Sequence, residues 1–170
     1  FDLGLPTEEA GSRALPAPDR DEGWMRTLFE AAVAGFYEFT LPKPQWCVSS
    51  PWLKWPIEGA TGGIDAILPG MKTDIVIDDR IRARRIIIDT KFTSILKPGR
   101  WDKERLSSGY IYQIYAYLRS QEDSGDPLAR NATGILLHPS TGLSVQESVT
   151  IQGHRIIFAT VDLAAPSLEI

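Results

Sequence analysis

The chain has a single cysteine, Cys47, among its 170 residues, and it contains no long uninterrupted hydrophobic run. One cysteine excludes an internal disulfide and agrees with a reducing cytoplasm. A membrane-spanning helix needs about 20 predominantly apolar residues, so no membrane segment is expected. The beginning, Phe1-Asp2-Leu3, lacks an initiator Met and the layout of a signal peptide. We therefore expect a piece of a longer cytoplasmic protein.

Other absences exclude further kinds of site. No G-x-x-x-x-G-K-[ST] motif occurs, so the chain has no P-loop with which to hydrolyse a nucleotide. No aromatic cage or pocket for a flipped base is visible. A catalytic Cys47 would need a histidine partner, and His138 and His154 lie in unrelated contexts. The net charge of −4 does not by itself indicate a nucleic-acid binder.

The length and the 43% hydrophobic content fit one globular domain with its own core. Residues 1–20 contain Gly, Pro and acids without periodicity, and we expect them to be a linker or a docking tail. Residues 21–170 are then the folded domain.

Hydrophobic periodicity predicts the elements of that domain. A helix is expected to begin at Asp21 and to stop at Pro42; its apolar positions include Trp24, Leu28, Ala32 and Phe36. Two buried strands, 73–78 and 86–92, predict a hairpin, and a helix over 107–120 follows a polar connection, 93–106. Also expected are an irregular strand pair or long loop over 46–58, a short strand over 64–68, a strand over 133–137, and a closing hairpin of 145–151 and 155–161. This order predicts an α/β to α+β fold with a mixed central sheet flanked by helices.

Charged side chains lie at the ends of the two central strands. Asp74 opens the first, and the second ends in Asp89-Thr90-Lys91. Because side chains alternate along a strand, Asp89 and Lys91 point the same way, and a hairpin brings Asp74 within a few ångströms of Asp89. Both carboxylates and the Thr90 carbonyl suit Mg²⁺, or Mn²⁺ in its place, and Lys91 can orient or deprotonate a water or offset phosphate charge. An isolated triplet of this kind is more often a strand-end salt bridge, so its context decides.

Two helices supply part of that context. Glu30 lies among the core positions of the first helix, where a charge needs a reason. Gln113 and Tyr117 are four residues apart and share one face of the second helix. The glutamine can hold a water or a phosphate, and the tyrosine can stack on DNA or donate a hydrogen bond. Two structural alternatives stay open: Glu30 at an exposed helix position, and Gln113 and Tyr117 as a pair that packs against the sheet.

Basic residues near Asp89 supply the remaining context for the predicted metal site. Nine of the eighteen Lys and Arg residues lie within 80–105, against three acids. This density predicts a positive stripe around Asp89, as a phosphodiester substrate requires. Lys97, Arg100 and Lys103 are the DNA contacts that we expect within it. A solvated arginine-rich loop is the alternative explanation for the stripe.

The ordered set Glu30, Asp74, Asp89-Thr90-Lys91 and Gln113-x-x-x-Tyr117 resembles the PD-(D/E)xK nuclease superfamily, including its RecB-like QxxxY variant. KTDIVI at 72–77, IIIDTKF at 86–92 and LSSGYIYQIYAYL at 106–118 look like C-terminal blocks of the McrC family, the nuclease subunits of McrBC modified-cytosine restriction systems. The resemblance covers about 24–163. Thr73 stands where the superfamily has Pro, a residue that supplies no ligand. Asp65, in Gly62-Gly63-Ile64-Asp65, is a rival for the first acid.

The resemblance implies a restriction-endonuclease-like fold and Mg²⁺-dependent hydrolysis of DNA phosphodiesters in an antiviral complex of the prokaryotic cytoplasm, at the nucleoid when acting. The implied partners are a McrB-like AAA+ GTPase hexamer and double-stranded DNA with 5-methylcytosine. Double-strand cutting from one site per chain suggests self-association through the nuclease domain. Two alternatives stay open: a non-catalytic adaptor that keeps the nuclease fold to stimulate an AAA+ partner, and a stand-alone RecB-like repair nuclease.

Overall fold

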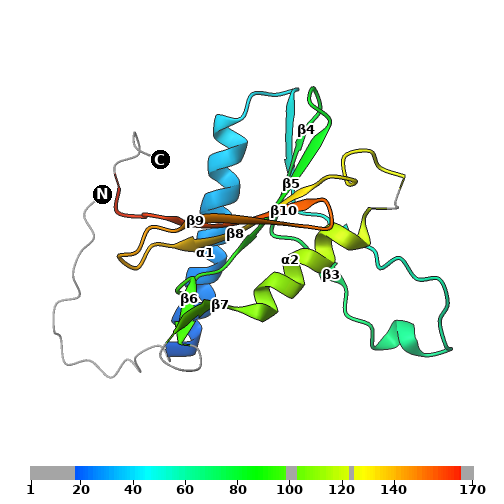
Figure 1. Ribbon diagram of the computed structural model, residues 1–170, viewed down its shortest axis with the longest axis horizontal. Coiled ribbons are helices and arrows are strands. Elements are labelled where there is room, and N and C mark those ends of the chain that lie inside the picture. Colours follow the sequence, from blue (N-terminus) through cyan, green and yellow to red (C-terminus); the bar gives the residue numbers. More distant parts are fainter. Residues whose placement is uncertain (1–17, 99–102, 123–124, 166–170) are drawn as a thin grey trace, which may run out of the picture.

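The structure is a computed structural model that describes residues 18–98, 103–122 and 125–165 (Figure 1). Its elements are α1 (Pro18–Thr40), β1 (Trp46–Ser49), β2 (Trp52–Leu53), a one-turn 3-10 helix η1 (Ile64–Ala66), β3 (Met71–Lys72), β4 (Ile75–Asp79), β5 (Arg84–Thr90), β6 (Leu96–Pro98), β7 (Glu104–Leu106), α2 (Ser108–Ser120), β8 (Thr133–Pro139), β9 (Gln146–Ile151) and β10 (His154–Val161). The expected mixed sheet flanked by helices is confirmed.

Six strands form the central sheet in the order β1-β4-β5-β8-β10-β9. β8 runs parallel to both β5 and β10, and the other neighbouring pairs are antiparallel. A parallel connection needs a crossover, and α2 lies within the one that joins β5 to β8. The two predicted hairpins, β4–β5 and β9–β10, are both present.

A helix packs on each face of this sheet, so the central strands are apolar on both sides. Ile75, Ile77 and Ile88 form a core cluster with Val33 and Tyr37 of α1. The neighbouring residues on the same strands, Val76 and Ile87, face the other side of the sheet. They belong to the cluster under α2, together with Leu136, Ile114 and Leu118. Gly134 allows the close approach of α2, because a Cβ at this position would lie 2.7 Å from the Ile114 side chain.

Several local predictions need correction. α1 begins at Pro18, not at Asp21, which agrees with the preference of proline for the first helical turn; the rest of the expected tail, 1–17, lies outside the described residues. The short strand expected over 64–68 is wrong. These residues contain η1, and Ile67 is 77% exposed without a strand partner. Figure 1 shows this segment in a loop that projects from the sheet.

Two other segments form strands whose partners were not predicted. Within 46–58, β1 joins the sheet edge beside β4, and β2 pairs with β3 before a loop. Within the connection 93–106, β6 and β7 form a small antiparallel pair. Among the described residues, no helix is long and apolar enough to cross a membrane.

Candidate functional site

Asp74 and Asp89 lie opposite each other at one end of the β4–β5 hairpin. The last paired residues at this end are Ile75 and Ile88, so the two acids occupy the next position on each strand. Oδ2 of Asp74 accepts hydrogen bonds from the Thr90 backbone N–H at 2.7 Å and from the Thr90 hydroxyl at 2.8 Å. These two bonds hold the first carboxylate against the second strand.

Asp89 forms an ion pair with Lys91, whose Nζ lies 2.7 Å from Oδ2 of Asp89. The aspartate is fully buried, and its Oδ1 has no hydrogen-bond partner within the described residues. Burial raises the pKa of Asp89 to about 6; Lys91 acts against this rise, and Asp74 and Glu30 add to it. A buried carboxylate with an unpartnered oxygen and acidic neighbours gains from a nearby cation.

α1 brings Glu30 to the same place. Its neighbour Phe29 is buried and packs against Phe92 with ring centroids 5.7 Å apart, which fixes the helix against the segment after β5. Burial raises the pKa of Glu30, and the charge of Asp74 raises it further, while Lys72 and Lys91 lower it. The structure therefore brings Glu30, Asp74, Asp89 and Lys91 into one electrostatic cluster, as the sequence predicts.

Asp89 is fully buried, and the other three side chains, Glu30, Asp74 and Lys91, border a pocket of about 260 Å³. It is lined by Arg26, Glu30, Asp74, Thr90, Lys91, Phe92, Thr93 and Tyr110. Sequence reasoning missed Arg26, Thr93 and Tyr110. Arg26 lies one helical turn before Glu30, a spacing that would have indicated its place. Tyr110 had no comparable signal, because α2 carries several tyrosines.

The donor atoms of the cluster suit a hard cation. Asp74, Asp89 and Glu30 offer only oxygen, which Mg²⁺ and Mn²⁺ prefer. No group of three or more His, Cys, Asp or Glu side chains within the described part of the chain is already arranged to hold a metal ion. A metal ion would therefore be held by two carboxylates, those of Asp74 and Asp89, and by a neutral ligand such as the Thr90 carbonyl. Asp89 offers the buried oxygen that has no hydrogen-bond partner among the described residues.

Gln113 and Tyr117 hold the backbone segment that precedes Asp74. Nε2 of Gln113 donates to the Tyr117 hydroxyl at 2.7 Å, and this hydroxyl donates to the Lys72 carbonyl at 2.8 Å. The chain is thus held two residues before Asp74. The expected stacking of Tyr117 on DNA is wrong for this structure, because the residue is only 5% exposed.

Replacing Tyr117 by phenylalanine is expected to lower the free energy of unfolding by about 1–2 kcal/mol, because it removes a hydroxyl that joins two partners. It should also weaken Mn²⁺ binding, since the segment that carries Asp74 loses its support. Urea unfolding and calorimetric metal titration measure the two effects. Tyr112→Phe is the matched control, because Tyr112 lies on the same helix and is 69% exposed. Equal metal affinity in both variants would contradict the bracing role.

The predicted positive stripe is divided between the two ends of the hairpin. Arg82 and Arg84 pair with Asp79 at 3.3 and 3.1 Å, and Arg85 pairs with Asp78 at 2.7 Å. These residues lie at the β4–β5 turn, at the opposite end of the strands from Asp89, and Figure 1 shows this turn far from β6 and β7. The arginines of the turn therefore neutralise neighbouring acids and do not form a stripe around Asp89.

The expected DNA contacts have different outcomes. Lys97 lies on β6, and its Nζ is 3.2 Å from the hydroxyl of Tyr110, which places it beside the pocket. Lys103 precedes β7 and is exposed. Arg100 lies outside the described residues. Contact of these side chains with DNA stays a prediction.

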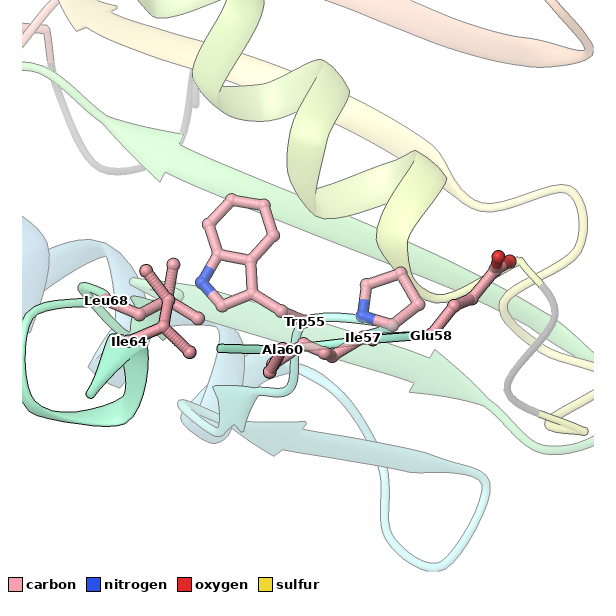
Figure 2. Close-up of a pocket in the computed structure, with 8 residues that line it drawn as sticks. Trp55, Ile57, Glu58, Ala60, Ile64 and Leu68 are labelled. Carbon is pink, nitrogen blue, oxygen red and sulfur yellow. The ribbon is translucent and has the colours of Figure 1, made fainter. Parts of the chain in front are cut away.

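Asp65 does not join the cluster. It is exposed on η1, away from the sheet, so Asp74 is the acid that meets Asp89. A separate hollow of about 540 Å³ lies in the same loop, lined by Trp55, Pro56, Ile57, Glu58, Gly59, Ala60, Ile64 and Leu68. Figure 2 shows its mainly apolar lining, in which Glu58 is the one charged side chain. This hollow lacks the groups that the predicted chemistry needs.

Comparison of the chain with models of known protein families gives no match, and comparison with curated proteins gives none either.

Proposed function

We propose that this domain is a Mg²⁺-dependent DNA endonuclease of the PD-(D/E)xK type, acting as the nuclease subunit of a modification-dependent restriction complex. The convergence of Glu30, Asp74, Asp89 and Lys91 supports it most. A domain without nuclease chemistry has no evident need for three neighbouring carboxylates, two of which line one pocket, because like charges destabilise a metal-free site.

Each residue of the cluster has a role in this proposal. Asp74, Asp89 and the Thr90 carbonyl would hold the metal ion, which when bound would supply an activated water and stabilise negative charge on the phosphate. Lys91 orients the attacking water or offsets phosphate charge from its place beside Asp89. Glu30 borders the same pocket from α1. Gln113 and Tyr117 act by positioning the segment before Asp74.

The proposed partners follow from the resemblance to the McrC family. A McrB-like AAA+ GTPase hexamer supplies the recognition of 5-methylcytosine and the movement of double-stranded DNA, and a second copy of the domain cuts the other strand. The chain itself carries no P-loop motif, so nucleotide hydrolysis is assigned to the partner. The proposed setting is the prokaryotic cytoplasm, during defence against foreign DNA.

A non-catalytic adaptor is the second candidate, and the Asp89–Lys91 pair is compatible with it, because a structural salt bridge has the same geometry. A stand-alone repair nuclease shares the chemistry but needs no motor. Cleavage of methylated DNA with and without the AAA+ partner distinguishes the repair nuclease, since the proposed subunit is expected to cut little alone.

Calorimetric titration with Mn²⁺ tests the metal-dependent function directly. The wild-type domain is expected to bind the ion, and the Asp74→Ala, Asp89→Ala double variant is expected to lose most of this binding. Asp78→Asn is the matched control, because this β4 carboxylate lies at the far end of the same hairpin and pairs with Arg85. Equal heats for the wild type and the double variant would reject the proposed function and favour the adaptor.

A further inference from the structure

Tyr110 contacts two lysines at the edge of the pocket. Nζ of Lys91 lies 5.1 Å from the centroid of the Tyr110 ring, and Nζ of Lys97 lies 4.7 Å from the same centroid. The Lys97 ammonium also donates a hydrogen bond of 3.2 Å to the phenol oxygen. An ammonium group near an aromatic face is attracted by the ring quadrupole, so one side chain restrains both cations.

The Tyr110 ring is itself held in place by a buried histidine of the sheet. Tyr110 lies in the first turn of α2, and its ring centroid is 6.0 Å from that of His138 on β8. His138 is buried, and its Nδ1 is 2.8 Å from the Thr93 carbonyl in the segment that follows Lys91. Burial lowers the pKa of His138, and the neighbouring lysines lower it further, so at neutral pH this ring offers packing surface without charge.

The phenol of Tyr110 lies beside two positively charged side chains, Lys91 and Lys97. Burial raises the pKa of Tyr110, but the hydrogen bond with Lys97, contact with Thr93 and the charges of both lysines lower it overall. Lys91 lines the pocket and reaches Asp89, whereas Lys97 is exposed on β6, beside the hydroxyl of Tyr110. Two cations next to one aromatic ring, of which one reaches the carboxylate cluster and the other is exposed, suit two phosphates of a single polynucleotide strand.

We propose that Tyr110 is a positioning residue that sets the strand register of the nuclease site. Its ring holds the Lys91 ammonium beside Asp89 at the phosphate to be cut, and its hydroxyl holds the Lys97 ammonium as the contact for a neighbouring phosphate. This inference depends on the proposed function, because it assigns a DNA strand to the same pocket.

Two substitutions separate the two contacts. Tyr110→Phe keeps the ring beside Lys91 and removes only the hydrogen bond to Lys97. We expect the DNA concentration for half-maximal cleavage to rise about 5-fold, the value for one lost hydrogen bond, with kcat nearly unchanged. Tyr110→Leu also removes the aromatic face, and we expect kcat to fall about 10-fold in addition.

The experiment uses the full protein assembled with its AAA+ partner and a methylated DNA duplex at several salt concentrations. If Lys97 loses its phosphate contact in Tyr110→Phe, the slope of log affinity against log salt falls by about 0.9. A merely structural role would leave this slope unchanged. Tyr112→Phe and Tyr112→Leu are the matched controls, because Tyr112 is exposed on the same helix, and both should behave as wild type.

The outcomes separate this inference from the proposed function. Unchanged half-saturation, kcat and salt slope in both Tyr110 variants would overturn the role of Tyr110, as would a parallel loss of every parameter together with thermal stability. In either case an inactive Asp89→Asn protein in the same series would leave the nuclease function standing. Normal cleavage by Asp89→Asn would overturn both.

Discussion

Replacing Asp89 by asparagine is expected to reduce DNA cleavage by about 10³-fold or more, because a metal ligand is lost that supports several kcal/mol of transition-state stabilisation. The side chain is fully buried beside Lys91, and asparagine has nearly the same shape. The fold should therefore persist. Cleavage of methylated DNA by the complex, with GTP hydrolysis by the partner as the internal control, measures the effect.

The same substitution is expected to change how stability depends on pH. The pKa of Asp89 is about 6 in the folded protein, whereas an aspartate in an unfolded chain has a pKa of about 3.9. Between these values the folded state holds a proton that the unfolded state has released, so the stability of the metal-free wild type falls as pH rises through this window. Asparagine carries no charge and lacks this loss. Above about pH 7 the metal-free variant should be more stable than the wild type, by on the order of 2 kcal/mol.

Urea unfolding in a chelator, at about pH 4 and about pH 7.5, measures this difference. Added Mg²⁺ should restore stability to the wild type and not to the variant, because only the folded wild type binds the ion. Asp78→Asn, at the other end of the hairpin, should keep cleavage and lose stability through the broken pair with Arg85. A stability difference between Asp89→Asn and wild type that does not vary with pH would show that the pKa of Asp89 is not raised.

Local sequence patterns were sufficient to predict the central hairpin and its acids. The apolar runs before Asp89 and after Asp74 are long enough to fix two buried strands. Both faces of these strands are buried, so the register is set by the length of the connection 80–83 between the paired residues Asp79 and Arg84. That register places Asp74 opposite Asp89. Glu30 could also be predicted from the sequence, because a charge beside the apolar Phe29, which is buried, indicates a polar site near the core.

The basic stripe was misjudged because the acids that neutralise it come just before it. A count that starts at Arg80 omits Asp78 and Asp79, which pair with three of the arginines. Asp79 also accepts hydrogen bonds from the backbone N–H groups of Ile81 and Arg82. An aspartate that bonds to the backbone two and three residues ahead is typical of a turn, so the sequence contained a signal for a closed, neutralised loop.

The contacts of Tyr110 had no such signal. They exist because β6 and β7 fold back and bring Lys97 to the first turn of α2, thirteen residues along the chain. The sequence predicts only a polar connection over 93–106. The path of such a connection is not determined until β6 and β7 pair. Pairings of short strands depend on tertiary packing more than on propensity, and the same holds for β2 and β3.

Replacing Lys91 by methionine is expected to lower cleavage on the order of 10²-fold or more, because one positioned charge next to the reacting phosphate is lost. Methionine keeps most of the packing of the lysine stem. Metal binding should persist near pH 8, since the ligand oxygens of Asp74 and Asp89 remain and the cation that competes for Asp89 is gone. Single-turnover cleavage and Mn²⁺ titration of the same protein measure the two properties separately.

This combination of lost cleavage and retained metal binding distinguishes Lys91 from the carboxylates, whose removal should abolish both. Lys43→Met is the matched control, because Lys43 is exposed between α1 and β1, near the end of β4 opposite to Asp74, and does not line the pocket. If Lys91→Met cuts normally and only unfolds more easily, the Asp89–Lys91 pair is a strand-end salt bridge, and the adaptor becomes the better explanation of the domain. If cleavage is lost while stability and metal affinity stay, the ammonium acts on the reaction itself.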